Sequence, residues 1–283
     1  MKKIAWITDS TCGLPPEFIE ENNIYVVTLN VIINGVSYKE DIDITKDEFY
    51  EKLKQPDVDA TTSQATLGDF IELYEMLKKE YDCGIAIHAS SELTGTYNSS
   101  VTAAEQTGFP VEVIDSKIGN YALGKMIRNG LALQAKGKSY EAIVSLIREY
   151  PALAEMYLLP SSLDQLKKSG RVSKGQAILA SLLNINLLLG FDEGKVVVVD
   201  KIRSKKRAKK RLFKLIEKKV NQFSLNEICV MHAGVIDLAH DWKDELEKAH
   251  KQIKVKIKTL VPVAGVHTGY GTMAVAWLND NEA

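Results

Sequence analysis

The segment Ile4-Ala5-Trp6-Ile7-Thr8-Asp9-Ser10-Thr11 passes from an apolar run directly into polar residues. The apolar, β-branched residues predict a buried strand, and the polar residues predict its end and a turn toward a helix. Asp and Ser side chains accept hydrogen bonds from free helix N–H groups, so a capped turn is one explanation of the polar cluster. The cluster is also a candidate binding site, because ligands of open α/β sheets bind at the carboxyl ends of the strands.

Short β-branched runs alternate with segments of helical period through the first half of the chain. This alternation predicts an α/β fold with βαβ units, a mostly parallel Rossmann-like sheet and flanking helices. Helix starts are indicated by Leu14-Pro15-Pro16-Glu17, by the capping-box pattern Thr45-Lys46-Asp47-Glu48 and by Thr66. The predicted strands cover 4–8, 25–33, 83–88 and 111–115, and the predicted later helices cover 67–81, 119–136 and 140–149.

The pattern changes after Pro151, which should stop the preceding helix. With 283 residues, the chain exceeds what one hydrophobic core usually supports. We therefore expect two domains, 1–155 and 156–283, with a ligand site between them. The second should be an α/β domain with a mixed or antiparallel sheet, because Asp192-Glu193-Gly194 is a hairpin signal between two strands. Its predicted strands cover 156–159, 186–191, 195–200, 228–232, 253–261 and 272–277, and its predicted helices cover 176–183, 205–222 and 238–250.

Composition and charge exclude several classes of protein. The formal net charge of -1 argues against non-specific nucleic-acid binding by the whole surface. The apolar run at the N-terminus is too short for a signal peptide, and no stretch approaches the roughly 20 apolar residues of a membrane span. The cysteines Cys12, Cys83 and Cys229 are odd in number and have no ligand spacing, which fits a reducing cytoplasm. Cys83 and Cys229 lie in apolar strands and are expected to pack in the core.

Two hydroxyl-rich loops are the strongest candidates for a binding site. Thr61-Thr62-Ser63-Gln64 precedes the helix capped by Thr66, and Ser90-Ser91-Glu92-Leu93-Thr94-Gly95-Thr96-Tyr97 joins a strand to a helix. Both place hydroxyls and N–H groups at helix N-termini, where the partial positive charge favours an anion. Each loop alone can be explained by helix capping, whereas two in one half favour a shared anion site.

The third candidate is the glycine-rich turn Gly265-Val266-His267-Thr268-Gly269-Tyr270-Gly271. A lone histidine is usually structural, but one held in such a turn near the chain end is a candidate ligand-binding residue. His232 is a weaker candidate at a strand end, and His240 and His250 are expected to be solvated on a polar helix.

A basic run over 201–211 carries eight positive charges in eleven residues. It is either a solvated helix face or a docking patch for a phosphate-bearing ligand, an acidic protein or an anionic membrane. No aromatic residue is interleaved with the charges, which disfavours stacking on nucleic-acid bases. The chain also has no Walker A sequence, GxGxxG, GxSxG or HExxH motif. From the residues alone, the sequence predicts a two-domain α/β protein with a hydroxyl-lined, anion-binding cleft.

Six motifs, in order and spacing, resemble the DegV family over essentially the whole chain. They are Thr8-Asp9-Ser10-Thr11, Thr62-Ser63-Gln64, Leu93-Thr94-Gly95-Thr96-Tyr97, Val113-Ile114-Asp115-Ser116, Leu166-Lys167-Lys168-Ser169-Gly170-Arg171-Val172 and Gly265-Val266-His267-Thr268-Gly269. The resemblance implies a two-domain protein that binds one long-chain, palmitate-like fatty acid between its domains. It implies the binding subunit of a bacterial fatty acid kinase, which presents the carboxylate to a separate ATP-binding subunit that makes acyl-phosphate for phospholipid synthesis. Such a carrier has no cofactor, metal or ATP site of its own.

The resemblance also assigns roles to residues. Thr62 and Thr94 would hydrogen-bond the carboxylate, with His267 in the same network. Arg171 and Arg203 would contact the phosphoryl group or the kinase subunit. The supporting loops would contribute Asp9, Ser10, Ser63, Gln64, Gly95, Thr96, Asp115 and Ser116.

The sequence departs from the family pattern at four places. Thr94 stands where Ser is usual, Ala65 and Tyr270 stand where Pro is usual, and Asn186-Leu187 replaces a common Lys-Pro pair. The hydroxyl of Thr94 should preserve binding, and the other changes bear on the preferred acyl chain. Two alternatives remain: a phosphoryl-transfer or hydrolytic enzyme using Asp9, Ser10 and His267, and a nucleic-acid or regulatory module working through 201–211. A transient membrane contact through the same basic run is also left open.

Overall fold

The computed structural model describes residues 2–172 and 185–280. Within them, three sheets carry the fold: four parallel strands, three antiparallel strands and a mixed sheet of six strands. The α/β class predicted from the sequence is confirmed, including the parallel first sheet and the mixed second one. The helix predicted over 176–183 lies outside the described residues.

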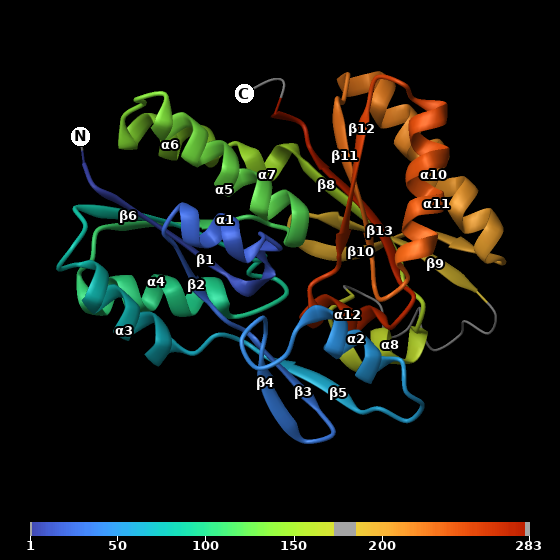
Figure 1. The fold of residues 1–283 in the computed structure, drawn as a ribbon, viewed down its shortest axis with the longest axis horizontal. Coiled ribbons are helices and arrows are strands. Elements are labelled where there is room, and N and C mark those ends of the chain that lie inside the picture. Colours follow the sequence, from blue (N-terminus) through green and yellow to red (C-terminus); the bar gives the residue numbers. More distant parts are fainter. Residues whose placement is uncertain (1, 173–184, 281–283) are drawn as a thin grey trace.

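The parallel sheet forms the first half of the molecule. Its strand order is β2-β1-β6-β7. Figure 1 shows α3 and α4 on one side of this sheet and α5 and α6 on the other. The strands are β1 (Ile4–Asp9), β2 (Ile24–Val27), β6 (Cys83–His88) and β7 (Val111–Asp115). The helices are α1 (Pro16–Glu21), α3 (Leu67–Leu77), α4 (Thr96–Thr107), α5 (Asn120–Ala135), α6 (Tyr140–Ile147) and α7 (Tyr150–Leu153). A 3₁₀ turn, η1 (Ser10–Cys12), follows β1.

The single strand predicted over 25–33 is wrong, because the chain leaves the parallel sheet after Val27 and joins another sheet at Asn30. Between these strands, Leu29 donates its N–H to Ser10 Oγ at 3.0 Å and accepts a bond from the Glu40 N–H at 3.2 Å. At Leu29, hydrogen bonds to Ser10 and Glu40 thus replace the strand pairing that a continuous strand would make. The three-stranded sheet has the order β4-β3-β5, with β3 (Asn30–Ile33), β4 (Val36–Lys39) and β5 (Ala60–Ser63).

Two of these three strands escaped the sequence analysis. The turn between β3 and β4 is Asn34-Gly35 with φ of 49° and 82°, which is the favoured dipeptide of a tight hairpin. That signal could have revealed β4. β5 has the sequence ATTS and could not be recognised by hydrophobicity, because only its pairing with β3 makes it a strand.

The six-stranded sheet forms the second half of the molecule, in the order β10-β9-β8-β13-β11-β12. Only β11 and β12 pair in parallel, and the predicted hairpin at Asp192-Glu193-Gly194 is confirmed. The strands are β8 (Ala154–Leu159), β9 (Asn186–Asp192), β10 (Lys195–Ile202), β11 (Glu227–His232), β12 (Lys254–Thr259) and β13 (Met273–Leu278). The helices α10 (Lys205–Phe223) and α11 (Ile236–Ala249) cover one face, as Figure 1 shows.

The remaining helices lie where the halves meet: α2 (Lys46–Leu53), α8 (Leu163–Ser169) and α12 (Pro262–Thr268). In Figure 1 they gather between the three-stranded sheet and the six-stranded sheet. Their helix starts follow the sequence signals, since the predicted capping box at Thr45 forms in full and Ser162 caps α8. Pro151 lies in the first turn of α7, which begins at Tyr150, and the preceding helix α6 already ends at Ile147.

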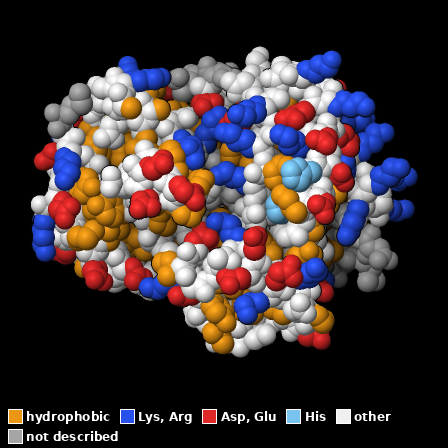
Figure 2. Space-filling view, in the orientation of Figure 1, with side chains coloured by type: hydrophobic (Ala, Val, Ile, Leu, Met, Phe, Trp, Pro, Cys, Tyr) orange, Lys and Arg blue, Asp and Glu red, His pale blue; other side chains and the backbone are white. Residues whose placement is uncertain are grey.

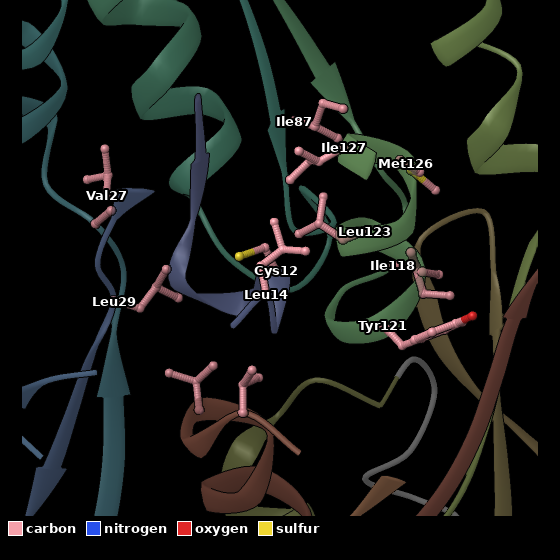
Figure 3. Packing of buried hydrophobic residues seen from close by; sticks show 14 of the residues in the cluster. Cys12, Leu14, Val27, Leu29, Ile87, Ile118, Tyr121, Leu123, Met126 and Ile127 are labelled. Carbon is pink, nitrogen blue, oxygen red and sulfur yellow. The ribbon is translucent and has the colours of Figure 1, made fainter. Parts of the chain in front are cut away.

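One large hydrophobic cluster joins the two halves. It holds residues of β1 and β6 together with Leu187, Met231 and Ala274 of the six-stranded sheet. Figure 3 shows its centre, where Cys12 and Leu14 lie opposite Leu123 of α5. The predicted core positions of Cys83 and Cys229 are confirmed, since both are buried. The domain boundary at 155 falls inside β8 and stays a prediction, because the shared cluster does not separate the halves there.

Candidate functional site

A cavity of about 400 Å³ lies between the two halves. Its volume falls in the range of small-molecule sites, roughly 300–1,000 Å³. Most of its wall is apolar and comes from distant parts of the chain: Leu29, Ile118, Met156, Leu158, Leu166, Val172, Leu189, Phe191, Val196, Leu260, Val261, Val263 and Ala264. We call this the main cavity.

Several polar residues of the main-cavity wall were predicted from the sequence as site residues. The wall includes Thr62, Thr94 and His267, which the sequence analysis placed together, and Arg171 beside them. Ser63, Gln64 and Gly95 line it as well. We call Thr62, Thr94, Arg171 and His267 the cavity cluster.

Thr62 and His267 are joined by a hydrogen bond of 3.0 Å between Oγ1 and Nε2. Thr62 lies on β5, whereas a loop was predicted there. His267 lies in the last turn of α12, whereas a glycine-rich turn was predicted. That prediction overlooked Pro262 as a helix start, and the helix ends where Gly269 adopts a φ of 93°.

Burial and the nearby Arg171 charge together lower the pKa of His267 to about 4. The imidazole is therefore neutral at physiological pH. A neutral ring that carries its proton on Nε2 donates it to Thr62 Oγ1, which leaves the Thr62 hydroxyl hydrogen free for a ligand.

Thr94 lies just before α4, in contact with Thr96 through a hydroxyl–hydroxyl hydrogen bond of 2.9 Å. The following residue, Gly95, approaches Gln64 so closely that an added Cβ would lie 2.1 Å from Gln64 Oε1. A larger residue at this position would require the Gln64 side chain to move, and the contact brings the two hydroxyl-rich segments together. The sequence analysis favoured a shared anion site for these two segments, and this contact places them next to each other.

Several predicted site residues support the wall without lining it. Asp115 accepts hydrogen bonds from Ser91 Oγ at 2.6 Å and from the Lys117 N–H at 2.8 Å, which fixes the loop before Thr94. Ser116 is buried and donates to the Ile118 carbonyl at 3.1 Å. Thr96 is also buried, in contact with Thr94.

Asp9 and Ser10 are interior residues that do not line the main cavity. Asp9 accepts hydrogen bonds from the N–H groups of Thr11 and Ala89, both at 2.9 Å, and pairs with His88 Nδ1 at 3.2 Å. Burial alone would raise the pKa of Asp9, but the His88 and Thr11 contacts and the Ala89 N–H bring it below the ordinary value. The capping explanation therefore fits Asp9, whereas Thr11 of the same segment lines the main cavity.

The His88 ring continues the chain of hydrogen bonds inward. Its Nε2 lies 2.9 Å from Ser100 Oγ, which lies 2.6 Å from the Tyr74 hydroxyl. Asp9, His88, Ser100 and Tyr74, which we call the buried cluster, match the residue types of a hydrolase triad. All four are buried and none lines the main cavity, so a substrate has no access to this serine. The enzyme alternative through Asp9, Ser10 and His267 has no common site in the described residues.

Glu40 links the segment that follows Asp9 to the helix that carries His267, and it was missed in the sequence. Its carboxylate accepts the Val263 N–H at the start of α12 at 2.7 Å and also a hydrogen bond from Ser10 Oγ. Burial raises the pKa of Glu40 to about 7, against the lowering effect of these two donors. Glu40 thus fastens the helix that carries His267.

Asn120 is a second residue that sequence reasoning missed. It lines the main cavity, is buried and has a φ of 55°. Neither amide atom has a hydrogen-bond partner within the described residues. An unpaired buried amide is unusual in a folded protein, so Asn120 gives the main-cavity wall hydrogen-bonding capacity that the described residues do not use.

The basic run spans the end of β10, the N-cap Ser204 and the first part of α10, whose start at Lys205 agrees with the predicted helix. Its Ala208, Leu212, Ile216 and Val220 face the core at four-residue spacing. Figure 2 shows Lys and Arg side chains at the right-hand edge, over α10 and α11. Lys209 pairs with Glu245 at 2.5 Å and Arg211 with Asp200 at 2.8 Å. Arg203 is exposed and does not line the main cavity, so the structure does not bring it to Arg171.

Two further observations limit the chemistry of the described part of the chain. Among residues 2–172 and 185–280, His, Cys, Asp and Glu side chains form no group suited to hold a metal ion. No helix in the same ranges is long and apolar enough to cross a bilayer.

Comparison with known proteins gives a consistent family. A family model described as an uncharacterised protein of the DegV family matches residues 3–280. A DegV domain-containing protein of Listeria innocua is 32% identical, with 98% of each chain covered. One of Staphylococcus aureus is 34% identical over 98% of this chain and 99% of its own.

Solved structures agree. DegV of Bacillus subtilis, described as a fatty acid binding protein, is 31% identical with a TM-score of 0.89, covering 98% of this chain and 99% of its own. A fatty acid binding DegV family protein of Streptococcus agalactiae is 29% identical with a TM-score of 0.90, covering 99% and 100%.

Proposed function

The chain belongs to the DegV family, and from that membership we propose that it binds one long-chain, palmitate-like fatty acid in the main cavity. The observation that carries the proposal is the composition of the cavity wall. The wall combines a mostly apolar surface with hydroxyls, a neutral imidazole and the Arg171 guanidinium, which suits a molecule with an alkyl chain and one carboxylate.

Apolar contact supplies the affinity. Burying the chain of palmitate removes about 14 methylenes from water, a gross gain of about 11 kcal/mol. Ordering of the chain and loss of free motion offset much of this gain. The cavity wall contributes side chains from both halves of the molecule, among them Leu29, Leu158 and Phe191.

The carboxylate needs hydrogen-bond donors, since an ionised group in a dry pocket costs several kcal/mol. Thr62 donates its hydroxyl while it accepts from His267, and Thr94 donates while it accepts from Thr96. N–H groups near Gly95 add to these donors. Arg171 lies close enough to lower the pKa of His267 and supplies positive charge at the same end of the cavity.

The bound fatty acid serves as substrate for a separate kinase subunit that brings ATP. A carboxylate oxygen attacks the γ-phosphorus, a new O–P bond forms, and the bond to the leaving ADP breaks. Hydroxyl donors leave the carboxylate more nucleophilic than a bidentate arginine would. The product is an acyl-phosphate for phospholipid synthesis, and the carrier contributes binding and presentation rather than turnover.

Two basic regions are proposed to meet the kinase subunit. Arg171 is exposed at the cavity wall, where it can contact the phosphoryl group. Arg203 and the exposed face of α10 provide a second positive surface. We place the protein in the cytoplasm, because its cysteines are all buried as free thiols, as a reducing compartment allows.

Denaturing mass spectrometry of an organic extract of the purified protein tests the fatty-acid proposal. We expect one long-chain fatty acid for each chain, and loading of stripped protein with palmitate should restore that ratio. An extract without fatty acid, together with stripped protein that fails to take up palmitate, would overturn the proposal. ATP or phosphate-ester turnover by the isolated chain would favour the enzyme alternative instead.

A further inference from the structure

A second, smaller cavity of about 100 Å³ lies on the far side of the cavity cluster. It shares Thr62, Ser169, Arg171 and His267 with the main cavity, so these four side chains form a partition between the two spaces. The rest of its wall comes from β5 and the loop before it, from α8 and from α12. We call it the side pocket.

The side pocket differs from the main cavity in chemistry. Its wall contributes the charged side chains of Asp59, Lys168 and Arg171 and the amide of Gln165. One water occupies roughly 30 Å³ in the liquid, so the space admits a small polar group and excludes a second alkyl chain.

We propose that the side pocket receives the phosphoryl group of an acyl-phosphate, held by Lys168 and the Gln165 amide together with Arg171. This inference rests on the proposed function. When a carboxylate at the partition becomes an acyl-phosphate, one of its oxygens becomes the bridge to phosphorus. The phosphoryl group must then lie next to the carboxylate site, and the side pocket is the polar space that shares its wall.

Arg171 already donates Nη1 to the Ser169 carbonyl at 2.5 Å and Nε to the Leu93 carbonyl at 3.5 Å, so its Nη2 group is the one left for such a ligand. Lys168 and Gln165 are less constrained. Lys168 pairs with Asp59 at 3.5 Å, but both side chains are more than 70% exposed (73% and 72%). An exposed pair of this kind is weak, so Lys168 can turn to a phosphoryl oxygen at little cost. The Gln165 Oε1, an acceptor, is buried without a hydrogen-bond partner in the described residues, so turning the amide to present its NH₂ group to a phosphoryl oxygen breaks no hydrogen bond of Oε1. Lysine N–H groups also suit phosphoryl oxygens.

Asp59 has the opposite effect. Among the described residues that line the side pocket, it is the only acidic one. Its charge opposes a doubly charged phosphoryl group and competes for Lys168. Replacing it should therefore strengthen phosphoryl binding without changing fatty acid binding.

The test uses full-length protein from which bound lipid has been removed, and it compares two probes of equal chain length. One is palmitate, and the other is a β-ketophosphonate in which a methylene replaces the bridging oxygen of the acyl-phosphate. Affinities are measured by calorimetry for the wild type and for Lys168→Ala, Lys167→Ala and Asp59→Asn. Lys167 is the matched control, because it carries the same charge on the same helix, pairs with Asp164 at 3.8 Å and does not line the side pocket.

We expect Lys168→Ala to weaken phosphonate binding by about threefold to tenfold and to leave palmitate binding unchanged. Asp59→Asn should strengthen phosphonate binding, and Lys167→Ala should change neither affinity by more than about twofold. Equal effects of the two lysine variants, or equal effects on both probes, would overturn the side-pocket assignment while the carrier function stands. If neither probe binds the wild type, the proposed function is wrong, and the side-pocket assignment is then wrong as well.

Discussion

The buried cluster and the cavity cluster use the same kinds of residue at neighbouring places in the fold. Each joins a histidine to a hydroxyl at about 3 Å: His88 to Ser100 at 2.9 Å and His267 to Thr62 at 3.0 Å. His88 is 0% exposed and reaches only protein groups, whereas His267 faces a cavity. The difference shows that access, rather than residue type, separates a structural hydrogen-bond network from a binding site.

The two clusters also differ in charge, because one holds an ionised carboxylate and the other a neutral imidazole. The buried cluster keeps an ionised Asp9, since His88 and two N–H groups satisfy it. The cavity cluster keeps His267 neutral, because burial and Arg171 disfavour its protonated form. One cluster is therefore complete in the protein alone, and the other has room for an anion to complete it.

The largest expected effect is the loss of Asp9. Asp9→Ala leaves the Thr11 and Ala89 N–H groups and His88 without their acceptor. We expect the free energy of unfolding, measured in urea, to fall by about 3–5 kcal/mol. Asp9→Asn, which keeps an acceptor oxygen, should lose less. A stable Asp9→Ala protein that no longer binds fatty acid would instead make the buried cluster part of the site.

Glu40, which accepts hydrogen bonds from Ser10 and from the Val263 N–H, should give a smaller and pH-dependent effect. Its folded pKa of about 7 exceeds the ordinary 4.5, so the folded state holds a proton that the unfolded state releases. Relative to Glu40→Gln, the wild type should therefore lose up to about 3 kcal/mol of stability as the pH rises from 4.5 to 7.

Urea titrations of both Glu40 proteins at several pH values measure this difference. Above pH 7 the difference in the free energy of unfolding between the two proteins should become constant, because Glu40 is then ionised in both the folded and the unfolded state. Identical pH profiles would mean that Glu40 does not titrate in this range.

The hydroxyls of the cavity cluster should affect binding rather than folding. In the double variant Thr62→Val and Thr94→Val, palmitate affinity should fall by roughly tenfold to a hundredfold, since the carboxylate loses its hydroxyl donors. Thr61→Val is the matched control, because Thr61 neighbours Thr62 on β5 without lining the main cavity. Calorimetry on stripped protein measures the affinity. A double variant that purifies with a full complement of fatty acid would show that these hydroxyls do not hold the carboxylate.

The smallest effect concerns the protonation of His267. In stripped protein, its ring resonance should titrate near pH 4 in an NMR experiment, because burial and Arg171 disfavour the imidazolium. Loading with palmitate should raise this midpoint, since a neighbouring carboxylate favours the charged ring. Palmitate affinity should therefore vary little between pH 6 and 8. An unchanged midpoint after loading would place the carboxylate away from His267.

Much of the fold follows from local patterns in the sequence. The β1, β6 and β7 strands, the capped starts of α2 and α3 and the hairpin before β10 rest on short-range signals of periodicity, capping and turn geometry. The errors lie where distant contacts override such signals. The predicted strand over 25–33 divides because Ser10 and Glu40 bind the backbone of Leu29.

The sequence by itself determined the α/β class, the two kinds of sheet and, through the ordered family motifs, a candidate set of Thr62, Thr94 and His267. Only the tertiary structure decided which polar residues share a cavity. It placed Thr62 and His267, 205 residues apart, within 3.0 Å, and it enclosed Asp9 and Ser10 in the interior. Residue type is a local property, whereas burial and access depend on how segments far apart in the chain pack together.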